Sequence, residues 1–135
     1  MFDRICKEKL GPLALRLALG LFCVYHGYLK IMVAGGTAWN PAMPVGWQFL
    51  LSWGELASGL AILVGYRCRI AAGVVLGLLV GSLVWWQGWK LFRMPVQTLE
   101  PTILLLLIGL ALLFLGAGEL SVDARSGASK PFKKK

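Results

Sequence analysis

Charged residues are scarce in this sequence of 135 residues. Lysine, arginine, aspartate and glutamate make up 15% of the chain, whereas 58% of its residues are hydrophobic. A soluble domain carries roughly 25% charged residues because its surface must stay hydrated. Long stretches carry no charge at all, including those from Ile70 to Trp89 and from Pro101 to Gly118. This composition excludes a soluble globular domain and a disordered chain, and it indicates a membrane protein.

Cysteine and histidine are also rare, which limits the cofactors that the chain can hold. The three cysteines, Cys6, Cys23 and Cys68, form no C-x-x-C pair, so neither a disulfide framework nor a dithiol redox centre is predicted. The single histidine, His26, is too little for a haem or a metal site. A glycine-rich nucleotide-binding loop is missing as well. We therefore predict no metal and no evident cofactor.

Four apolar runs are each long enough to cross a bilayer. A helix of about 20 residues spans the roughly 30 Å of hydrocarbon, and helices satisfy their own backbone groups in lipid. The runs cover about residues 12–33, 46–65, 70–89 and 99–117, between an N-terminal segment (1–11) and a basic tail (119–135). The predicted fold is an all-α integral membrane four-helix bundle within residues 12–118.

Basic residues flank these runs unevenly. The N-terminal segment, the second connection and the tail carry ten of them: Arg4, Lys7, Lys9, Arg67, Arg69, Arg125, Lys130, Lys133, Lys134 and Lys135. The other side carries Lys90 and Arg93, with Lys30 near its edge. Since positively charged loops stay in the cytoplasm, both termini are expected there. The net charge of +8 thus reflects topology, and we expect lipids and membrane subunits, not nucleic acid, as partners.

Glycine and tryptophan suggest how the bundle is packed. Gly73, Gly77 and Gly81 are spaced four residues apart, a pattern that lets helices approach closely in lipid. This repeat predicts either close packing within the chain or a seam between two copies. The tryptophans gather toward the outer side, where an interfacial belt is typical. Trp53 and Trp85 should lie deeper and are candidates for lining a cavity in a wider outer half.

Ionisable residues within the runs are the most informative feature. At about 1.5 Å of rise per residue, His26 and Glu55 lie at similar heights, and Lys30 and Glu100 lie near the outer interface. His26 and Lys30 are four residues apart and share one helix face. The first helix is therefore expected to face carboxylates from the second and fourth helices.

Two interpretations of this cluster stay open, because ionisable groups in membranes mark either structural contacts or functional sites. In the structural one, Glu55 is neutralised by His26 or Lys30, and Glu100 is a favourable acid at a helix N-terminus. In the functional one, His26 and Glu55 hydrogen-bond or protonate a small polar ligand such as a quinone headgroup. Histidine suits this role because it exchanges protons near neutral pH.

Arg16 lies near the inner edge of the first run. It is expected either to extend its charged end toward water or to pair with Glu119 or Asp123, just beyond the fourth run. We predict Arg16 and Asp123 as a structural charge pair.

Three segments together resemble the DoxX family of small four-helix bacterial and archaeal membrane proteins. They read "LRLALGLFCVYHGYLKI", "GELASGLAILVGYRCRIAAGVVLGLLV" and "LEPTILLLLIGLALLFLGAGELSVDA". The resemblance covers roughly residues 12–124. The matching positions are Arg16, His26, Gly27, Lys30, Glu55, Gly59, Gly65, Arg69, Glu100, Gly116, Gly118, Ser121 and Asp123.

The resemblance implies a place in membrane redox chemistry. The family takes its name from a subunit of an archaeal thiosulfate:quinone oxidoreductase, and relatives are linked with membrane oxidoreductase assemblies. It implies a subunit of a respiratory or photosynthetic complex in a bacterial or archaeal plasma membrane, with a quinone as the expected ligand. Catalysis by this chain alone is not implied. The alternatives are a structural accessory subunit without a ligand and a carrier of small solutes or protons.

Overall fold

The chain folds into helices. The computed structural model describes residues 10–41, 43–88 and 96–126, with side chains except at 34, 85–87 and 96–99, and these residues include no strand. The elements are α2 (Gly11–Met32), η2 (Ala34–Gly36), α3 (Val45–Val64), α4 (Cys68–Gly81), the π-helical η3 (Ser82–Gln87), α5 (Val96–Leu115) and α6 (Val122–Arg125). The predicted all-α membrane fold is confirmed; α2, α3 and α5 lie within three residues of the expected bounds, whereas α4 ends at Gly81 and η3 continues the third run to Gln87.

Length and composition separate the long helices into two groups. Gly11–Met32 and Val45–Val64 are each long and apolar enough to cross a membrane. The described apolar stretches Cys68–Val84 and Glu100–Leu115 are shorter. Proline suits the first turn of α2, because the missing N–H at Pro12 would have no helical partner there.

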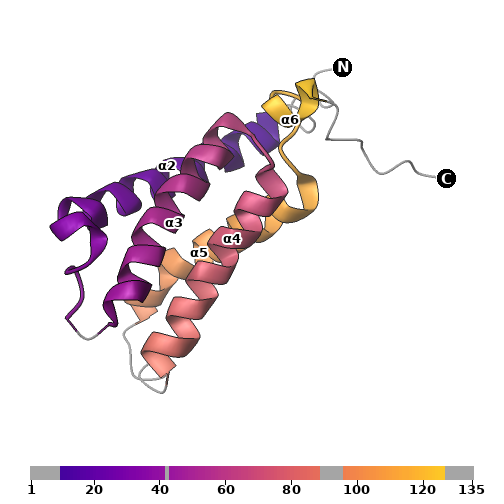
Figure 1. Ribbon diagram of the computed structural model, residues 1–135. Coiled ribbons are helices and arrows are strands. Elements are labelled where there is room, and N and C mark those ends of the chain that lie inside the picture. Colours follow the sequence, from indigo (N-terminus) through magenta and orange to yellow (C-terminus); the bar gives the residue numbers. More distant parts are fainter. Residues whose placement is uncertain (1–9, 42, 89–95, 127–135) are drawn as a thin grey trace.

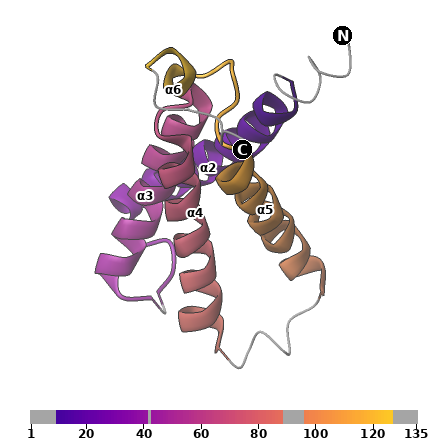
Figure 2. The same cartoon turned by 90° about the vertical axis from the view of Figure 1, so that its right-hand side faces the viewer.

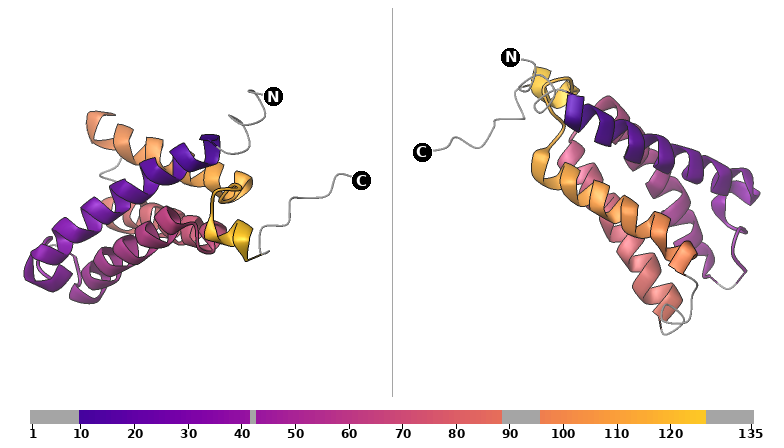
Figure 3. Two further views of the ribbon diagram at one scale, coloured as in Figure 1. Left: turned by 90° about the horizontal axis from the view of Figure 1, so that it is seen from above. Right: turned by 180° about the vertical axis from the view of Figure 1, so that it is seen from behind.

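The four long helices form a ring in which each contacts two neighbours. Helix α2 packs against α3 and α5, and α4 packs against the same two helices from the other side (Figure 3). Figure 1 shows α6 at one end of the bundle, here called the α6 end. Helices α4 and α5 lie close together there and diverge toward the opposite end, here called the loop end (Figure 2).

The apolar core lies mainly toward the α6 end. Its fully buried side chains include Leu19, Ile62, Cys68, Val75 and Leu112, one or more from each long helix. In sequence these residues are nearer to the α6 ends of their helices than to the loop ends. The bundle is therefore tightly packed at one end, and the polar cavity described below lies toward the other.

The turn between α3 and α4 requires glycine at residue 65. Gly65 has φ of 76°, and its N–H and that of Tyr66 donate to the Ala61 carbonyl, which ends α3 in a left-handed cap. A Cβ atom on Gly65 would also lie 2.6 Å from Nη2 of Arg16. Both the backbone conformation and the space beside it therefore exclude a larger residue.

The closest helix approach joins α2 and α3. A Cβ atom on Gly27 would lie 2.7 Å from the backbone nitrogen of Leu56. Likewise, a Cβ atom on Gly59 would lie 2.9 Å from the backbone nitrogen of Val24. Because the neighbours are backbone atoms, glycine at these positions sets the distance between the two helices.

The glycine repeat of α4 does not serve this purpose. A Cβ atom would meet nothing within 4 Å at Gly77 or Gly81, and at Gly73 it would make an ordinary 3.7 Å contact with Leu113. The expectation that this repeat packs closely within the chain is therefore wrong. The alternative seam between two copies stays a prediction.

Alanine substitutions at Gly27 and Gly77 are expected to differ in their effect on stability. Gly27→Ala forces α2 and α3 apart and is expected to lower the free energy of unfolding by about 2 kcal/mol. Gly77→Ala adds a methyl group in open space and is expected to be neutral or slightly stabilising, since alanine favours helix. Thermal unfolding of both variants in one detergent measures the difference, and equal midpoints would contradict it.

Candidate functional site: a polar cavity inside the bundle

A buried ion pair joins α2 to α3. Nζ of Lys30 lies 2.7 Å from each carboxylate oxygen of Glu55 and donates a hydrogen bond to both. Glu55 is 8% exposed, so its charge is largely removed from solvent. A buried carboxylate is tolerated when a cation balances it and its oxygens accept hydrogen bonds. The pair therefore fixes the C-terminal part of α2 against the middle of α3.

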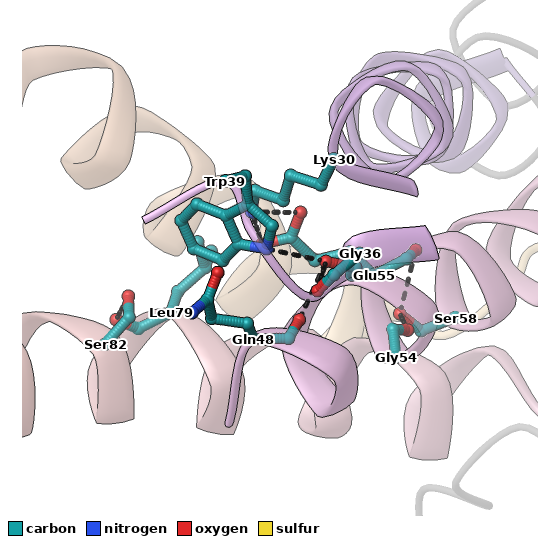
Figure 4. Close-up of polar contacts among 10 residues, drawn as sticks. Lys30, Gly36, Trp39, Gln48, Gly54, Glu55, Ser58, Leu79 and Ser82 are labelled. Atoms are coloured by element: carbon teal, nitrogen blue, oxygen red, sulfur yellow. Dashed lines mark hydrogen bonds and ion pairs between the residues drawn. The ribbon is translucent and has the colours of Figure 1, made fainter. Parts of the chain in front are cut away.

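Trp39 covers this pair. Its ring centroid lies 4.9 Å from Nζ of Lys30, within the range of a cation–π interaction. The indole Nε1 donates to Oγ of Ser52, 2.9 Å away, and that hydroxyl in turn donates to the carbonyl of Gln48. Figure 4 shows the indole beside Lys30 and Glu55. The aromatic ring thus closes one side of the charged pair.

The connection that carries Trp39 is held to α3 by further hydrogen bonds. Gln48 is buried, and its amide donates to the Met43 carbonyl at 2.7 Å and accepts from the Asn40 N–H at 3.0 Å. Nε1 of Trp53 donates to the Gly35 carbonyl at 3.2 Å. These contacts tie both halves of the connection to the first turns of α3.

Beside the ion pair lies a cavity of about 250 Å³. All four long helices or their extensions contribute to its walls, and its polar side chains come from α2, α3, η3 and α5. Its lining consists of Phe22, His26, Lys30, Glu55, Leu79, Ser82, Leu83, Pro101, Thr102 and Leu105. A charged and polar wall therefore faces a partly open space within an otherwise apolar bundle.

His26 presents its ring to this cavity. The imidazole stacks on Phe22 with centroids 4.0 Å apart and meets the edge of Tyr25 at 5.6 Å. Among the described residues, its contacts are aromatic and not hydrogen bonds. A neutral imidazole has one donor and one acceptor nitrogen, so His26 offers both to a molecule in the cavity.

The structure brings together three of the four predicted ligand candidates. His26, Lys30 and Glu55 line one cavity, whereas Glu100 is exposed and its successors Pro101 and Thr102 line the wall instead. Glu100 therefore lies outside the cluster of His26, Lys30 and Glu55, because its side chain is exposed and does not line the cavity. Among the described residues, no group of three His, Cys, Asp or Glu side chains is placed to hold a metal ion.

The predicted aromatic lining is not found at Trp53. Its side chain is 45% exposed and packs against Phe49 with ring centroids 6.0 Å apart. It lines neither the cavity beside the ion pair nor a smaller groove between α3 and α4. Trp53 occupies an outward face of α3, so it does not enclose a ligand there. The side chain of Trp85 lies outside the described part of the structure, although its backbone belongs to η3.

Arg16 occupies a second polar site, at the α6 end. The guanidinium is 2% exposed and donates to four backbone carbonyls. Their oxygens belong to Ile62 (3.0 Å), Leu63 (2.6 Å), Ala117 (3.2 Å) and Leu120 (2.8 Å). The first two lie in the last turn of α3, where carbonyls carry partial negative charge. The Leu63 oxygen is free of the helical ladder there, and the Ile62 oxygen also accepts from the Gly65 N–H at 3.1 Å. Arg16 thus ties α3 to the segment after α5.

Asp123 has a matching role at the start of α4. Its carboxylate, 9% exposed, accepts from the N–H of Arg67 at 2.7 Å and from the N–H of Cys68 at 2.9 Å. These N–H groups form the positive end of α4. The predicted ion pair with Arg16 is therefore not formed, because backbone groups at helix ends satisfy each charge separately.

Several residues of the cavity escaped the sequence analysis. Ser82 and Thr102 line it without carrying a charge, and Trp39, which contacts Lys30 beside it, was one of the tryptophans expected only in an interfacial belt. Neutral hydroxyl residues give no strong signal in an apolar run. The sequence did offer one clue to the position of Trp39. Only a short connection separates it from Lys30, and a short connection can fold back over the end of α2.

Comparison with known proteins identifies one match. The family model described as DoxX matches residues 11–88, which is more than half of the chain and includes His26, Lys30, Glu55 and Ser82. No curated protein matches the sequence, and no solved structure matches it.

Proposed function

Because the chain belongs to the DoxX family and is a membrane protein, we propose that it is a subunit of a quinone-linked redox complex and that its cavity binds the quinone headgroup. The observation that carries this proposal is the cavity itself. It places a paired lysine and glutamate and an imidazole against a space of about 250 Å³ within an apolar bundle. Polar groups that converge on a concave space are typical of a ligand site.

The lining has the hydrogen-bond donors that quinone carbonyls require. The ammonium of Lys30 has three N–H donors, and the two oxygens of Glu55 accept from two of them. In the proposal, the third donates to one quinone carbonyl, and the imidazole of His26 donates to the other. Glu55 holds the ammonium in place, and Trp39 limits the access of water to it.

The volume of the cavity also restricts the ligand. Pockets for whole drug-sized molecules enclose roughly 300–1,000 Å³. A space of about 250 Å³ suits a ring with its carbonyl oxygens better than it suits a complete lipid-soluble quinone. The proposal therefore assigns the headgroup to this cavity and leaves the hydrocarbon chain outside it.

Removing the charge of Glu55 tests the headgroup assignment. Binding of a benzoquinone with one isoprene unit is measured in detergent for the wild type and for Glu55→Gln. Glutamine loosens the hold on Lys30, so the affinity is expected to fall about tenfold, or about 1.4 kcal/mol. Glu100→Gln is the matched control because Glu100 is exposed and outside the cavity.

Each alternative result has a definite meaning. Equal affinity in the wild type and Glu55→Gln would remove Glu55 from the site. Absence of binding in the wild type would remove the headgroup proposal. An equal loss in Glu55→Gln and Glu100→Gln would indicate a general effect of charge and not a contact in the cavity.

The charge distribution supports a location and an orientation. Arg67, Arg69 and Arg125 lie at the α6 end, whereas Lys30 lies nearer to the loop end. Within the proposal, the protein spans a bacterial or archaeal plasma membrane with the α6 end in the cytoplasm. Labelling of single cysteines introduced at Arg125 and Asn40 from either side of sealed vesicles distinguishes the two orientations.

The closed Lys30–Glu55 pair also supports a second function, that of a structural accessory subunit without a ligand. In that case the pair fixes helix register, and the exposed apolar faces of the bundle dock onto other membrane subunits. Co-purification from native membranes with the subunits of a defined oxidoreductase, but without bound quinone, would favour it. Quinone retained in such a complex would favour the ligand site.

A further inference from the structure

A second, apolar groove lies between α3 and α4. It encloses about 100 Å³, and its walls come from the start of α3, the preceding connection and the last turns of α4. Its lining consists of Met43, Trp47, Leu51, Gly77, Leu78, Gly81 and Ser82. With the exception of the Ser82 hydroxyl and the indole N–H of Trp47, these side chains offer hydrocarbon or sulfur surface.

The groove and the polar cavity share a wall. Ser82 lines both of them. On α3, Leu51 lines the groove and Glu55, one helical turn further on, lines the cavity. On α4, Leu78 lines the groove and its neighbour Leu79 lines the cavity. The two spaces are therefore adjacent, one lined mainly by apolar residues and the other by charged and polar ones.

Features of α4 and η3 near Ser82 leave little side-chain volume between the groove and the cavity. Ser82 is the first residue of the π-helical segment η3, and its hydroxyl donates to the carbonyl of Leu79 at 2.9 Å, back onto its own helix. Such π-helical insertions are frequent at functional sites. Gly77 and Gly81 carry no side chain, and a Cβ atom on either would meet nothing within 4 Å. The face of α4 is thus open along the groove.

We infer that the groove holds the first part of the hydrocarbon chain of the ligand whose headgroup lies in the polar cavity. This inference rests on the proposed function and extends it from a headgroup site to an amphipathic ligand with an isoprenoid chain. The shared Ser82 supports this occupant, because a chain attached to a ring beside Glu55 has the groove as its adjacent apolar surface. The volume of about 100 Å³ suits a chain segment rather than a helix of a partner.

Chain length and groove volume can be varied independently. The affinities of a benzoquinone without a side chain and of the same quinone with one isoprene unit are measured in one detergent. The ratio of the two affinities is then compared between the wild type and Gly77→Leu, whose side chain fills the groove. Val80→Leu is the matched control, since Val80 is exposed on the same helix and does not line the groove. Partition of each quinone into detergent cancels in this comparison.

In the wild type, the one-unit quinone is expected to bind about tenfold more tightly than the quinone without a side chain, because the groove adds packing contacts. Gly77→Leu is expected to reduce this preference to about twofold while the affinity for the quinone without a side chain stays unchanged. Val80→Leu is expected to keep the wild-type ratio. Gly81→Leu provides a second filled groove if Gly77→Leu does not fold, as judged by thermal unfolding.

The outcomes separate this inference from the headgroup proposal. An unchanged ratio in both filled-groove variants overturns the inference and leaves the headgroup site intact. A failure of both quinones to bind the wild type overturns both proposals. A change of oligomeric state in Gly77→Leu with no change in the ratio identifies the groove as a contact between copies and contradicts the inference.

Discussion

Replacing Arg16 with glutamine is expected to lower the free energy of unfolding by about 3 kcal/mol or more. The Arg16 guanidinium donates to four carbonyl oxygens, and the residue is 2% exposed. Water therefore cannot readily supply the hydrogen bonds that these oxygens lose when the guanidinium is removed. A buried acceptor left without its donor costs about 1–3 kcal/mol, and glutamine reaches fewer of these oxygens than arginine does. Without the hydrogen bonds of Arg16, the end of α3 would no longer be held to the segment that follows α5.

Arg69→Gln is the matched control for this experiment. Arg69 lies at the same end of the bundle, but it is exposed and makes one long hydrogen bond, 3.4 Å, to the carbonyl of Phe114. Its replacement is expected to change stability by less than about 0.5 kcal/mol, as for most surface substitutions. Thermal unfolding in a single detergent gives both values. Similar losses in the two variants would show that the carbonyl contacts of Arg16 are not its main contribution.

Breaking the Lys30–Glu55 pair is expected to separate stability from ligand binding. Lys30→Met leaves the carboxylate of Glu55 buried without its cation, which costs about 3 kcal/mol or more. The double variant Lys30→Met/Glu55→Leu removes both charges and replaces them with side chains of similar volume. Such replacements are often neutral, so the double variant is expected to regain most of the lost stability.

Quinone binding is expected to follow a different pattern in the same variants. Both Lys30→Met and the double variant lack the ammonium that donates to the quinone in our proposal, so neither is expected to bind the one-unit quinone. A stable double variant that still binds with wild-type affinity would show that the pair is structural. A double variant no more stable than Lys30→Met would show that the pair contributes more than charge balance.

The positions of the helices were predictable because hydrophobicity alone specifies them. Long uncharged runs must cover about 20 residues to cross a bilayer, and glycine or proline marks where they stop. Helix α3, for example, covers Val45–Val64 where residues 46–65 were predicted. The packing of the helices was less predictable. The glycines that permit the close approach of α2 and α3, Gly27 and Gly59, lie on different helices and form no repeat, whereas Gly77 and Gly81 of the regular α4 repeat face open space.

The site was predictable where it depends on charge and helical spacing. His26 and Lys30 share a face of α2, and a lone mid-span acid such as Glu55 needs a cation close to its own height. Glu100 was expected to face the same cluster but does not line the cavity, because height alone does not say which way a side chain points. The partners of Arg16 and Asp123 were missed because they are backbone groups, which every residue has and which no sequence pattern reveals.

The carbonyls around Arg16 have a consequence for biosynthesis. Two of them come from α3, but the other two, at Ala117 and Leu120, are translated about a hundred residues after Arg16 itself. A nascent chain that has inserted its first two helices therefore carries a positive charge that is half satisfied. Release of the first two helices from the insertion machinery would be unfavourable until the segment with Ala117 and Leu120 has been translated. Arg16 therefore makes closure of the fold depend on completion of the polypeptide.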